Sequence, residues 1–508
     1  MNIARARHYT SIRACGTDWT GSTVGYFGMI RIDDDVYRWM GPAGDSGVTG
    51  VTKTVTQKTA TVSPLNTRYT FQIAESVAFN VTWTTALKGH DKDLGKATRP
   101  VTFVTLDVKS IDGKEHAISA YFDTTGESVV ANVLTDEVIW KRGADGASAN
   151  MEILSIGTSA QNYLAQGTDR INWGYQYVAV PRSKEAHTVM TSSASSRGSF
   201  ATSLNAFTSL KDDEAKARRV SDKWPVLAHV FDFGNLGAND KATTHFSLAI
   251  DEVFSMSYFG TAMQPLWKRS IGSAGAMLSA IEQEYEQLMS DTKAFDDDMI
   301  ARATSVGGDK YATTTALVYR QSFGGTIAVW NNVTGKEWAF MKEISSDGDV
   351  STVDVLYPAF PIFMLEAPEF FRKALLPLFT YAANETSTYG MKQDYNLAWA
   401  PHHLGHWPVC DLAPSRQEQM PMEESGNMLI MIAGIVQAQS GNAQWLAPYI
   451  EILDLWANYT WVWIEAGERE ITFHNRKTER DSQRRSSLRT LQDFGTSRPW
   501  QPALHRRL

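Results

Sequence analysis

The sequence predicts a multidomain chain of the β + α class, in which an antiparallel β-sandwich is followed by a helical domain. Short alternations of apolar and polar residues recur up to about residue 260, with little helical pattern between them. A segment rich in Gly, Pro and Ser follows at 261–276, and beyond it apolar residues recur with helical spacing. The length of 508 residues allows more than one domain.

Two stretches illustrate the strands expected within residues 17–260. Residues 28–41, GMIRIDDDVYRWMG, contain two short runs around the turn-forming residues Asp33-Asp34-Asp35. Residues 101–122, VTFVTLDVKSIDGKEHAISAYF, contain two alternating runs around Asp112-Gly113. The second pattern predicts a β-hairpin, with its two strands paired across the turn.

Helices are expected beyond the segment 261–276, which we interpret as a linker. Apolar residues share one face of an otherwise acidic helix at Leu278, Ile281, Tyr285 and Leu288. Apolar helical stretches recur near 310–323, 361–380, 423–438 and 443–460, and a strand-like pair, GTIAVW and KEWAFMKEI, lies between the first two. The helical domain therefore spans 277–460.

The two ends of the chain differ from these domains. Residues 1–16 are basic at their start but lack the apolar region of a signal peptide, so the location of the chain stays open. Residues 461–508 are rich in arginine and lack an apolar period, which indicates a disordered basic tail or an out-of-frame segment. We favour the second interpretation, because the helical pattern stops in mid-course.

Composition excludes several classes of function. A net charge of −8 and a pI of 5.8 argue against a nucleic-acid partner. No window is apolar enough for a membrane span. Cys15 and Cys410 are the only cysteines and lie in no motif, so neither a disulfide framework nor a zinc site is supported. The partner that remains is a small-molecule substrate, and the oligomeric state is not predicted.

Two adjacent carboxylates, Glu423 and Glu424, precede an apolar helical run at 428–436. Such a run indicates a helix buried on every side. A carboxylate at a helix N-terminus is stabilised by the helix dipole, so one of the two residues could simply cap the helix. Carboxylates at the end of a buried helix can also activate water or donate a proton in a pocket.

Two further segments carry chemically active side chains. Residues 341–363 contain Lys342, Glu343, Asp347, Asp349 and Asp354, whose spacing does not match a calcium-binding EF-hand loop. Calcium is therefore not indicated, although carboxylates would accept it, and no cofactor is predicted. Residues 400–411 contain His402, His403 and His406, but the nearby Pro and Gly residues favour a loop over a metal-binding helix. We assign no metal ligand.

Six collinear segments resemble the fungal and bacterial glutaminase A-type proteins. They lie at 18–41 (DWTG to RWMG), 170–181 (RINWGYQYVAVP), 317–325 (LVYRQSFGG), 342–363, 400–408 (APHHLGHWP) and 420–430 (MPMEESGNMLI). In that family a β-sandwich precedes an (α/α)6 barrel of six helical hairpins. The resemblance therefore implies an incomplete (α/α)6 toroid after the sandwich, with 1–16 and 461–508 outside the family pattern.

The resemblance also implies a function, which is hydrolysis of the side-chain amide of L-glutamine by carboxylates in a pocket. The residues it proposes as catalytic are Glu424, Glu423, Asp347 and Glu343. The residues it proposes for substrate binding are Lys342, Arg320, Asn427, His402, Asp354 and Trp173. Family members are exported, and they carry Asp where this chain has His403.

Two alternatives remain open at this point. The same architecture occurs in glycoside hydrolases, in which Trp173, Tyr175 and Trp407 would stack on sugars, although buried core aromatics are the commoner outcome. Family members also continue past residue 459 into a segment with a TDDFAGH-like motif, which this chain replaces with its arginine-rich tail. If those aspartates are catalytic, the chain is an inactive remnant.

Overall fold

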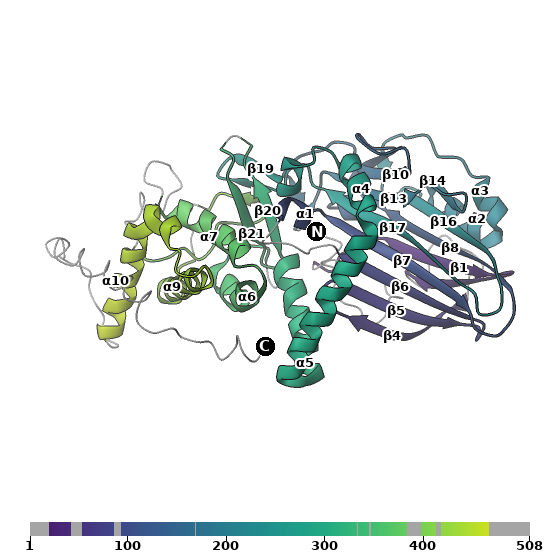
Figure 1. The fold of residues 1–508 in the computed structure, drawn as a ribbon. Helices are drawn as coiled ribbons and strands as arrows, with labels where there is room; N and C mark the ends of the chain where they lie inside the picture. Colours follow the sequence, from purple (N-terminus) through teal and green to yellow (C-terminus); the bar gives the residue numbers. More distant parts are fainter. Residues whose placement is uncertain are drawn as a thin grey trace.

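The computed structural model describes residues 20–41, 53–85, 93–167, 169–332, 334–344, 347–383, 398–412 and 418–466. The molecule is elongated, with the β-sandwich at one end and the helices at the other (Figure 1). The starting segment 1–16, Cys15 and the tail from residue 467 onward lie outside the described residues. None of the described helices combines the length and apolar character needed to cross a membrane.

The sandwich consists of a six-stranded and a nine-stranded sheet. The order of the first is β14 (Ala186–Ser192), β16 (Pro225–Leu236), β8 (His116–Thr125), β1 (Tyr26–Ile32), β2 (Asp35–Met40) and β3 (Lys53–Thr54). The order of the second is β15 (Arg218–Arg219), β9 (Glu137–Arg142), β10 (Met151–Thr158), β13 (Tyr175–Pro181), β17 (Lys241–Asp251), β7 (Val101–Ser110), β6 (Val77–Thr85), β5 (Asn66–Ile73) and β4 (Thr56–Val62). Apolar side chains from both sheets form one buried core between them.

The two runs around the turn at Asp33 are confirmed as strands, whereas the hairpin predicted at Asp112-Gly113 is wrong. β1 pairs with β2 in antiparallel fashion, and Asp33 occupies the turn with a positive φ of 53°. β7, however, pairs with β6 and β17, whereas β8 pairs with β1 and β16 in the other sheet. The turn at Asp112-Gly113 therefore connects the two sheets. Alternation indicates which face of a strand is buried, but it does not choose the neighbouring strand.

The sandwich part also contains short helices and a two-stranded sheet. These elements are α1 (Leu94–Ala97), η1 (Gly126–Val129), β11 (Gln166–Gly167), β12 (Arg170–Ile171), α2 (Ser193–Thr202) and α3 (Leu204–Thr208). Phe200 of α2 and Phe207 of α3 pack on Tyr121 of β8. The outer face of the six-stranded sheet is therefore covered, which is why nearly every residue of β8 is buried.

A long helical segment connects the sandwich to the rest of the molecule. Residues 261–276, expected as a linker, contain β19 (Thr261–Pro265), η2 (Leu266–Arg269) and the start of α4 (Ala274–Gln283). α5 (Tyr285–Gly324) bends sharply at Gly308, so that two helical arms meet at an angle (Figure 1). Leu278, Ile281, Tyr285 and Leu288 share one apolar cluster with Phe103 of the sandwich, as their spacing predicts.

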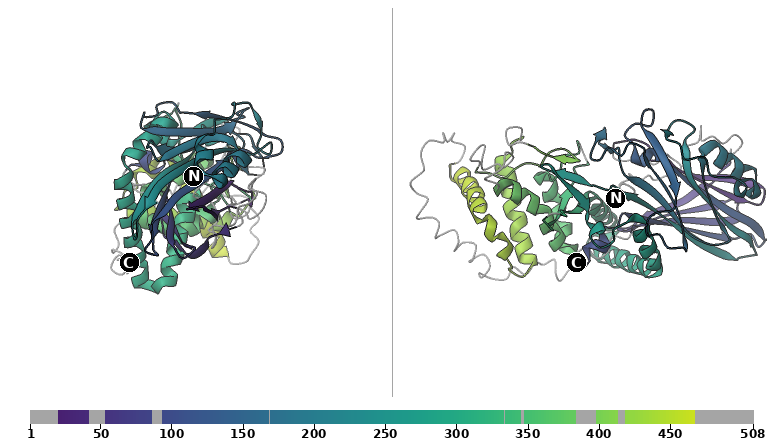
Figure 2. Two further views of the ribbon diagram at one scale, coloured as in Figure 1. Left: turned by 90° about the vertical axis from the view of Figure 1, so that its right-hand side faces the viewer. Right: turned by 90° about the horizontal axis from the view of Figure 1, so that it is seen from above.

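The helical part begins with a small five-stranded sheet in the order β21 (Glu337–Met341), β20 (Thr326–Trp330), β19, β18 (Met256–Tyr258) and β22 (Val409–Cys410). The helices α6 (Val353–Glu366), α7 (Pro368–Ala383), α9 (Pro421–Ala438), η4 (Gln444–Tyr449) and α10 (Ile450–Ala466) follow. Seen from above, they extend away from the sandwich (Figure 2). The predicted helices and the β20–β21 pair are confirmed, and Cys410 is buried.

The helix α9 differs from its prediction in one respect. Met428, Met431, Ile432 and Ile435 are buried, but the side chain of Ile430 is 50% exposed. The helix is therefore buried on one side and not all round. An unbroken apolar run shows that a helix has no strongly polar face, but it does not show how many neighbours cover it.

Candidate active site

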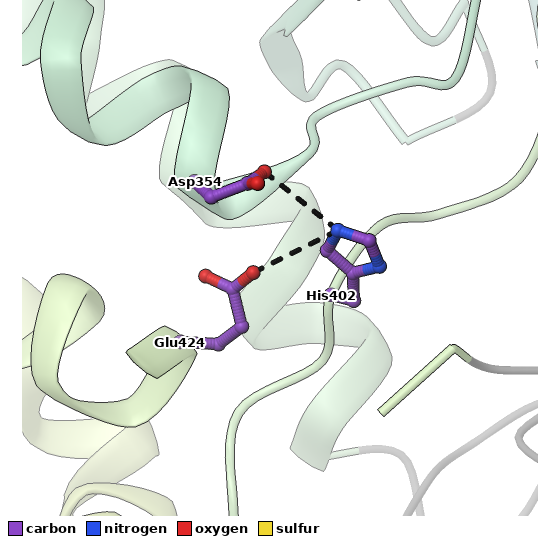
Figure 3. A group of neighbouring side chains, drawn as sticks. All are labelled: Asp354, His402 and Glu424. Carbon is purple, nitrogen blue, oxygen red and sulfur yellow. Dashed lines mark ion pairs between the residues drawn. The ribbon is translucent and has the colours of Figure 1, made fainter. Parts of the chain in front are cut away.

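Three chemically active side chains meet between two helices and a loop (Figure 3). Asp354 lies in the first turn of α6, Glu424 lies in the first turn of α9, and His402 lies in the loop 398–412. The Nε2 atom of His402 lies 3.6 Å from Oδ1 of Asp354 and 3.8 Å from Oε1 of Glu424. We call these residues the Asp354–His402–Glu424 cluster.

Backbone hydrogen bonds hold the loop against both helix N-termini. The carbonyl of His402 accepts a hydrogen bond of 2.8 Å from the N–H of Val353. Two residues earlier, the N–H of Ala400 donates to Oγ of Ser425 at 3.0 Å. His402 is thus fixed beside the start of α6, and the loop is fixed beside the start of α9. Both helices direct the positive ends of their dipoles toward this region, which favours carboxylates.

The cluster is deeply buried on one side and open on the other. Glu424 is 0% exposed, whereas the side chain of Asp354 is 34% exposed. Burial, followed by the nearby charge of Asp354, raises the pKa of Glu424 to about 8. Asn427, one turn further along α9, donates a hydrogen bond of 3.4 Å from Nδ2 to Oε2 of Glu424. Solvent can reach the cluster on the side of Asp354.

The adjacent residues Glu423 and Glu424 have different environments. In an α-helix successive side chains are about 100° apart, so two neighbours cannot face the same pocket. Glu424 is fully buried in the cluster, and Glu423 is exposed to solvent. The structure thus separates two residues that the sequence could not distinguish, and the catalytic role predicted for Glu423 stays a prediction.

The other two histidines of the loop belong to a second group, which joins the helical part to the sandwich. Nδ1 of His403 lies 3.1 Å from Oδ2 of Asp349, and His406 lies 3.5 Å from the same carboxylate. His406 also contacts Asp169, which belongs to the sandwich, at 2.6 Å. Burial and the charge of Asp347 raise the pKa of Asp349 to about 6, while His406 opposes the rise. Sequence patterns gave no sign of Asp169.

Aromatic residues reinforce the same junction. Trp173 stacks on Trp407 with 5.6 Å between ring centroids, and Nζ of Lys342 lies 3.8 Å from the centroid of Trp407. Lys342 also donates to the carbonyl of Asp169 at 3.3 Å. Trp173 and Trp407 are 0% and 4% exposed, so neither ring offers a face to a sugar. The substrate roles predicted for Lys342 and Trp173 stay predictions.

The remaining predicted residues have their described contacts elsewhere. Arg320 donates hydrogen bonds from Nη1 to the carbonyls of Ser63 and Asn66, at 2.8 and 3.0 Å, and so ties α5 to the sandwich. Asp347 is exposed and accepts a hydrogen bond from the N–H of Asp349, while Glu343 makes backbone hydrogen bonds in the same turn. Of the ten predicted site residues, the structure brings together Glu424, Asp354, His402 and Asn427.

The cluster combines groups that can accept and donate protons with groups that can bind a cation. Carboxylates and imidazoles are the usual general acids and bases of hydrolases. The ligand atoms of its three residues lie within 4.8 Å of one another, and no other group of three such residues is this close in the described part of the chain. Outside the cluster, Glu418 reaches to 4.0 Å from Nδ1 of His402, a neighbour that the sequence did not indicate.

Comparison with known families assigns both parts of the chain. Residues 308–462 match the Glutaminase A six helical-hairpin domain. Residues 65–302 match DUF5127, a domain of unknown function. The boundary between the two matches falls within α5, close to its bend at Gly308.

Two fungal proteins are similar over most of this chain. Glutaminase A of Aspergillus oryzae is 30% identical over 455 residues, which cover 87% of this chain and 61% of that protein. A protein of Arthroderma benhamiae, named as a probable glutaminase, is 26% identical over 357 residues, which cover 67% of this chain and 39% of that protein. This chain therefore spans less than two thirds of the length of either relative.

Among solved structures, a kojibiose phosphorylase candidate from the human microbiome matches 90% of this chain and 51% of its own, with 11% identity and a TM-score of 0.43. The two family matches lie in the expected order along the chain, and the first of the two fungal relatives extends over both. A sandwich followed by hairpin helices, with these matches on each part, places the chain in the glutaminase A-type family.

Proposed function

We propose that this protein hydrolyses the side-chain amide of L-glutamine to glutamate and ammonia at the Asp354–His402–Glu424 cluster. The observation that carries the proposal is the convergence of a fully buried carboxyl group, a carboxyl group open to solvent and an imidazole. The similarity to Glutaminase A supports the choice of substrate. The cluster lies within the matched six-hairpin domain.

Amide hydrolysis needs two proton transfers, and the cluster has groups for both. The oxygen of water bonds to the amide carbon and loses a proton, and the nitrogen gains a proton as the C–N bond breaks and ammonia leaves. Asp354 and Glu424 each place one carboxylate oxygen near Nε2 of His402, and the three atoms lie within 4.8 Å of one another, so a proton taken from the water has only a short path to the departing nitrogen. The exposed side of Asp354 is where the substrate would enter.

The substitution Glu424→Gln tests this proposal, because it keeps the size of the side chain and removes its acid–base chemistry. We expect kcat/KM for L-glutamine to fall by about 10²–10⁴-fold, the usual contribution of a positioned acid or base. Ammonia release measures the activity, and thermal melting shows whether the variant is folded. Glu451→Gln is the matched control, since Glu451 is an exposed carboxylate in the first turn of the neighbouring helix α10.

Two results would contradict the proposal. One is a folded wild-type protein that releases no ammonia from L-glutamine. The other is a Glu424→Gln variant that retains the wild-type rate. Release of reducing sugar from an oligosaccharide panel by the same preparation would favour a glycoside hydrolase instead.

A further inference from the structure

We infer that Asp354, His402 and Glu424 bind a divalent transition-metal ion of the zinc or manganese class. The inference rests on the proposed function for its chemistry, since the ion would act at the same cluster. Its test, however, measures binding and does not need activity. The argument comes from the spacing of the three residues, the environment of two oxygen atoms and the kinds of donor present.

The spacing is wrong for hydrogen bonds and suited to a shared cation. Nε2 of His402 lies 3.6 Å and 3.8 Å from the two carboxylate oxygens, beyond the usual hydrogen-bond range. Ligands about 2.0–2.2 Å from a tetrahedral metal ion lie about 3.4 Å from one another. All three ligand atoms fall within 4.8 Å of one another, so a cation between them needs only a small contraction.

The two oxygens that face His402 are buried without a hydrogen bond. Oε1 of Glu424 and Oδ1 of Asp354 have no hydrogen-bond donor among the residues that the structure describes. A buried carboxylate oxygen in that state is unfavourable, unless a cation or a water molecule satisfies it. These are the same two atoms that lie nearest to Nε2 of His402. A single cation between these two oxygens and Nε2 of His402 would therefore satisfy both of them.

The surroundings orient the ligands as the outer shell of a metal site does. Asn427 donates to Oε2 of Glu424, which leaves Oε1 directed at His402. The carboxylate of Glu418 lies 4.0 Å from Nδ1 of His402, on the ring edge away from the cluster. This separation exceeds a hydrogen bond, so Glu418 supplies a nearby negative charge and does not fix the tautomer. The hydrogen bond from Val353 to the carbonyl of His402 holds the residue in place.

The donor set selects the class of ion. Calcium and magnesium prefer oxygen ligands throughout, and an imidazole nitrogen is a poor ligand for either. One imidazole with two carboxylates suits zinc or manganese, and three protein ligands leave a position for water. An ion bound here would lower the pKa of that water, which would supply the nucleophile for amide hydrolysis near neutral pH.

Metal binding by the full chain tests the inference. After treatment with a chelator and dialysis, titration calorimetry with Zn²⁺, Mn²⁺ and Ca²⁺ gives stoichiometry and affinity. We expect about one Zn²⁺ or Mn²⁺ per chain. We expect Glu424→Gln and His402→Ala to bind at least about 100-fold more weakly, since even outer-shell changes cost 10–100-fold. Glu451→Gln should bind as the wild type does.

A second variant and a spectroscopic measurement distinguish a loss of metal binding from a loss of folding. Asp354→Asn alters the most exposed ligand, so it should leave the melting temperature nearly unchanged while weakening binding. Co²⁺ bound at the cluster should give visible absorption that Glu424→Gln abolishes. No binding by the folded wild type, equal affinity in all variants, or binding of Ca²⁺ in preference to Zn²⁺ and Mn²⁺ would each overturn the inference.

The two proposals can fail separately. Binding of one ion without release of ammonia would leave the metal site standing and remove the glutaminase activity. Release of ammonia at the full rate by metal-free protein would support the glutaminase activity and contradict a role for the metal ion in it.

Discussion

At the scale of single residues, burial separates side chains that look alike in the sequence. Glu424 is fully buried, and its immediate neighbour Glu423 is exposed. The same contrast holds for histidine. His402 lies among carboxylates, whereas His229 of β16 lies among Phe122, Phe231 and Phe246 in the sandwich core. The chemistry of each residue follows from what surrounds it.

His229 should make the sandwich sensitive to acid. It is 0% exposed, its ring nitrogens have no hydrogen-bond partner among the described residues, and burial lowers its pKa to about 3. In the unfolded chain this pKa is about 6.5. The stabilising contribution of neutral His229 is therefore complete above pH 6.5 and is lost as the pH falls toward 3, by about 1.4 kcal/mol per pH unit.

Replacing His229 with leucine, which is similar in volume and cannot ionise, should flatten this dependence. Urea unfolding at pH 7 and at pH 4 measures the free energy of unfolding of both proteins. We expect the wild type to lose about 3 kcal/mol more than His229→Leu between these two values. If the free energy of unfolding fell by the same amount in both proteins between pH 7 and pH 4, His229 would not be buried in its neutral form.

At the scale of elements, the bend in α5 depends on one glycine. Gly308 has φ 75° and ψ −176°, a conformation that is nearly restricted to glycine. A Cβ atom added at Gly308 would meet nothing within 4 Å, so the cost of a substitution there comes from the backbone alone. Gly198, within the helix α2, has the same open surroundings without a positive φ.

These two glycines form a matched pair. Gly308→Ala should lower the free energy of unfolding by about 1–3 kcal/mol, because alanine is strained at this φ and ψ. Gly198→Ala should raise it by about 0.5–1 kcal/mol, because alanine favours a helix interior. Chemical denaturation measures both changes. A neutral Gly308→Ala would mean that α5 is straight or bends at another residue.

The sequence predicted most elements but not their partners. Alternation gave the strands β1, β2, β7 and β8, and helical spacing gave the apolar face of α4 and the start of α5. The pairing of β7 and β8 was wrong, because the two runs around Asp112-Gly113 belong to different sheets. Local sequence fixes local geometry, whereas strand order depends on segments far away in the chain.

The same limit applies to the candidate site. Glu424 was singled out by its place at the start of an apolar helix, and the resemblance to the glutaminase A-type family placed Asp354 and His402 at the same pocket. Their meeting depends on the loop 398–412 binding to the starts of two helices, through contacts that no local pattern contains. The contact of Asp169 was missed for a related reason, since its partner His406 lies far away in the sequence.

At the scale of the whole molecule, the helices and one end of the sandwich share an apolar cluster, which is separate from the core between the two sheets. A single cluster of buried residues includes Leu65, Ile171 and Trp173 of the sandwich together with Trp407, Met428 and Trp456 of the helical part. The ion pair of Asp169 with His406 and the hydrogen bonds of Arg320 cross the same junction. Because this cluster and these polar contacts link the two parts, we expect both parts to unfold together.

Calorimetry of wild type and Trp407→Ala tests this coupling. The wild type should unfold in one transition. Loss of the Trp407 ring, which stacks on Trp173, should cost about 3–5 kcal/mol and split the transition in two. Trp461→Ala is the control, since the side chain of Trp461 is 61% exposed, and it should keep a single transition. A single transition in Trp407→Ala would show that other contacts are enough to make the two parts unfold together.

The parallel pairing of β18 with β22 has a consequence for how the protein is made. Ser257 pairs with Val409, and Tyr258 pairs with Cys410, so the loop that carries His402 is anchored to residues about 150 positions earlier. A ribosome that adds about 5–20 residues per second needs roughly 8–30 s to cover that distance. The sandwich strands leave the ribosome first and can collapse during this interval. The nascent chain therefore acquires the loop that carries His402 only after the strand that receives it, so the Asp354–His402–Glu424 cluster forms late in synthesis.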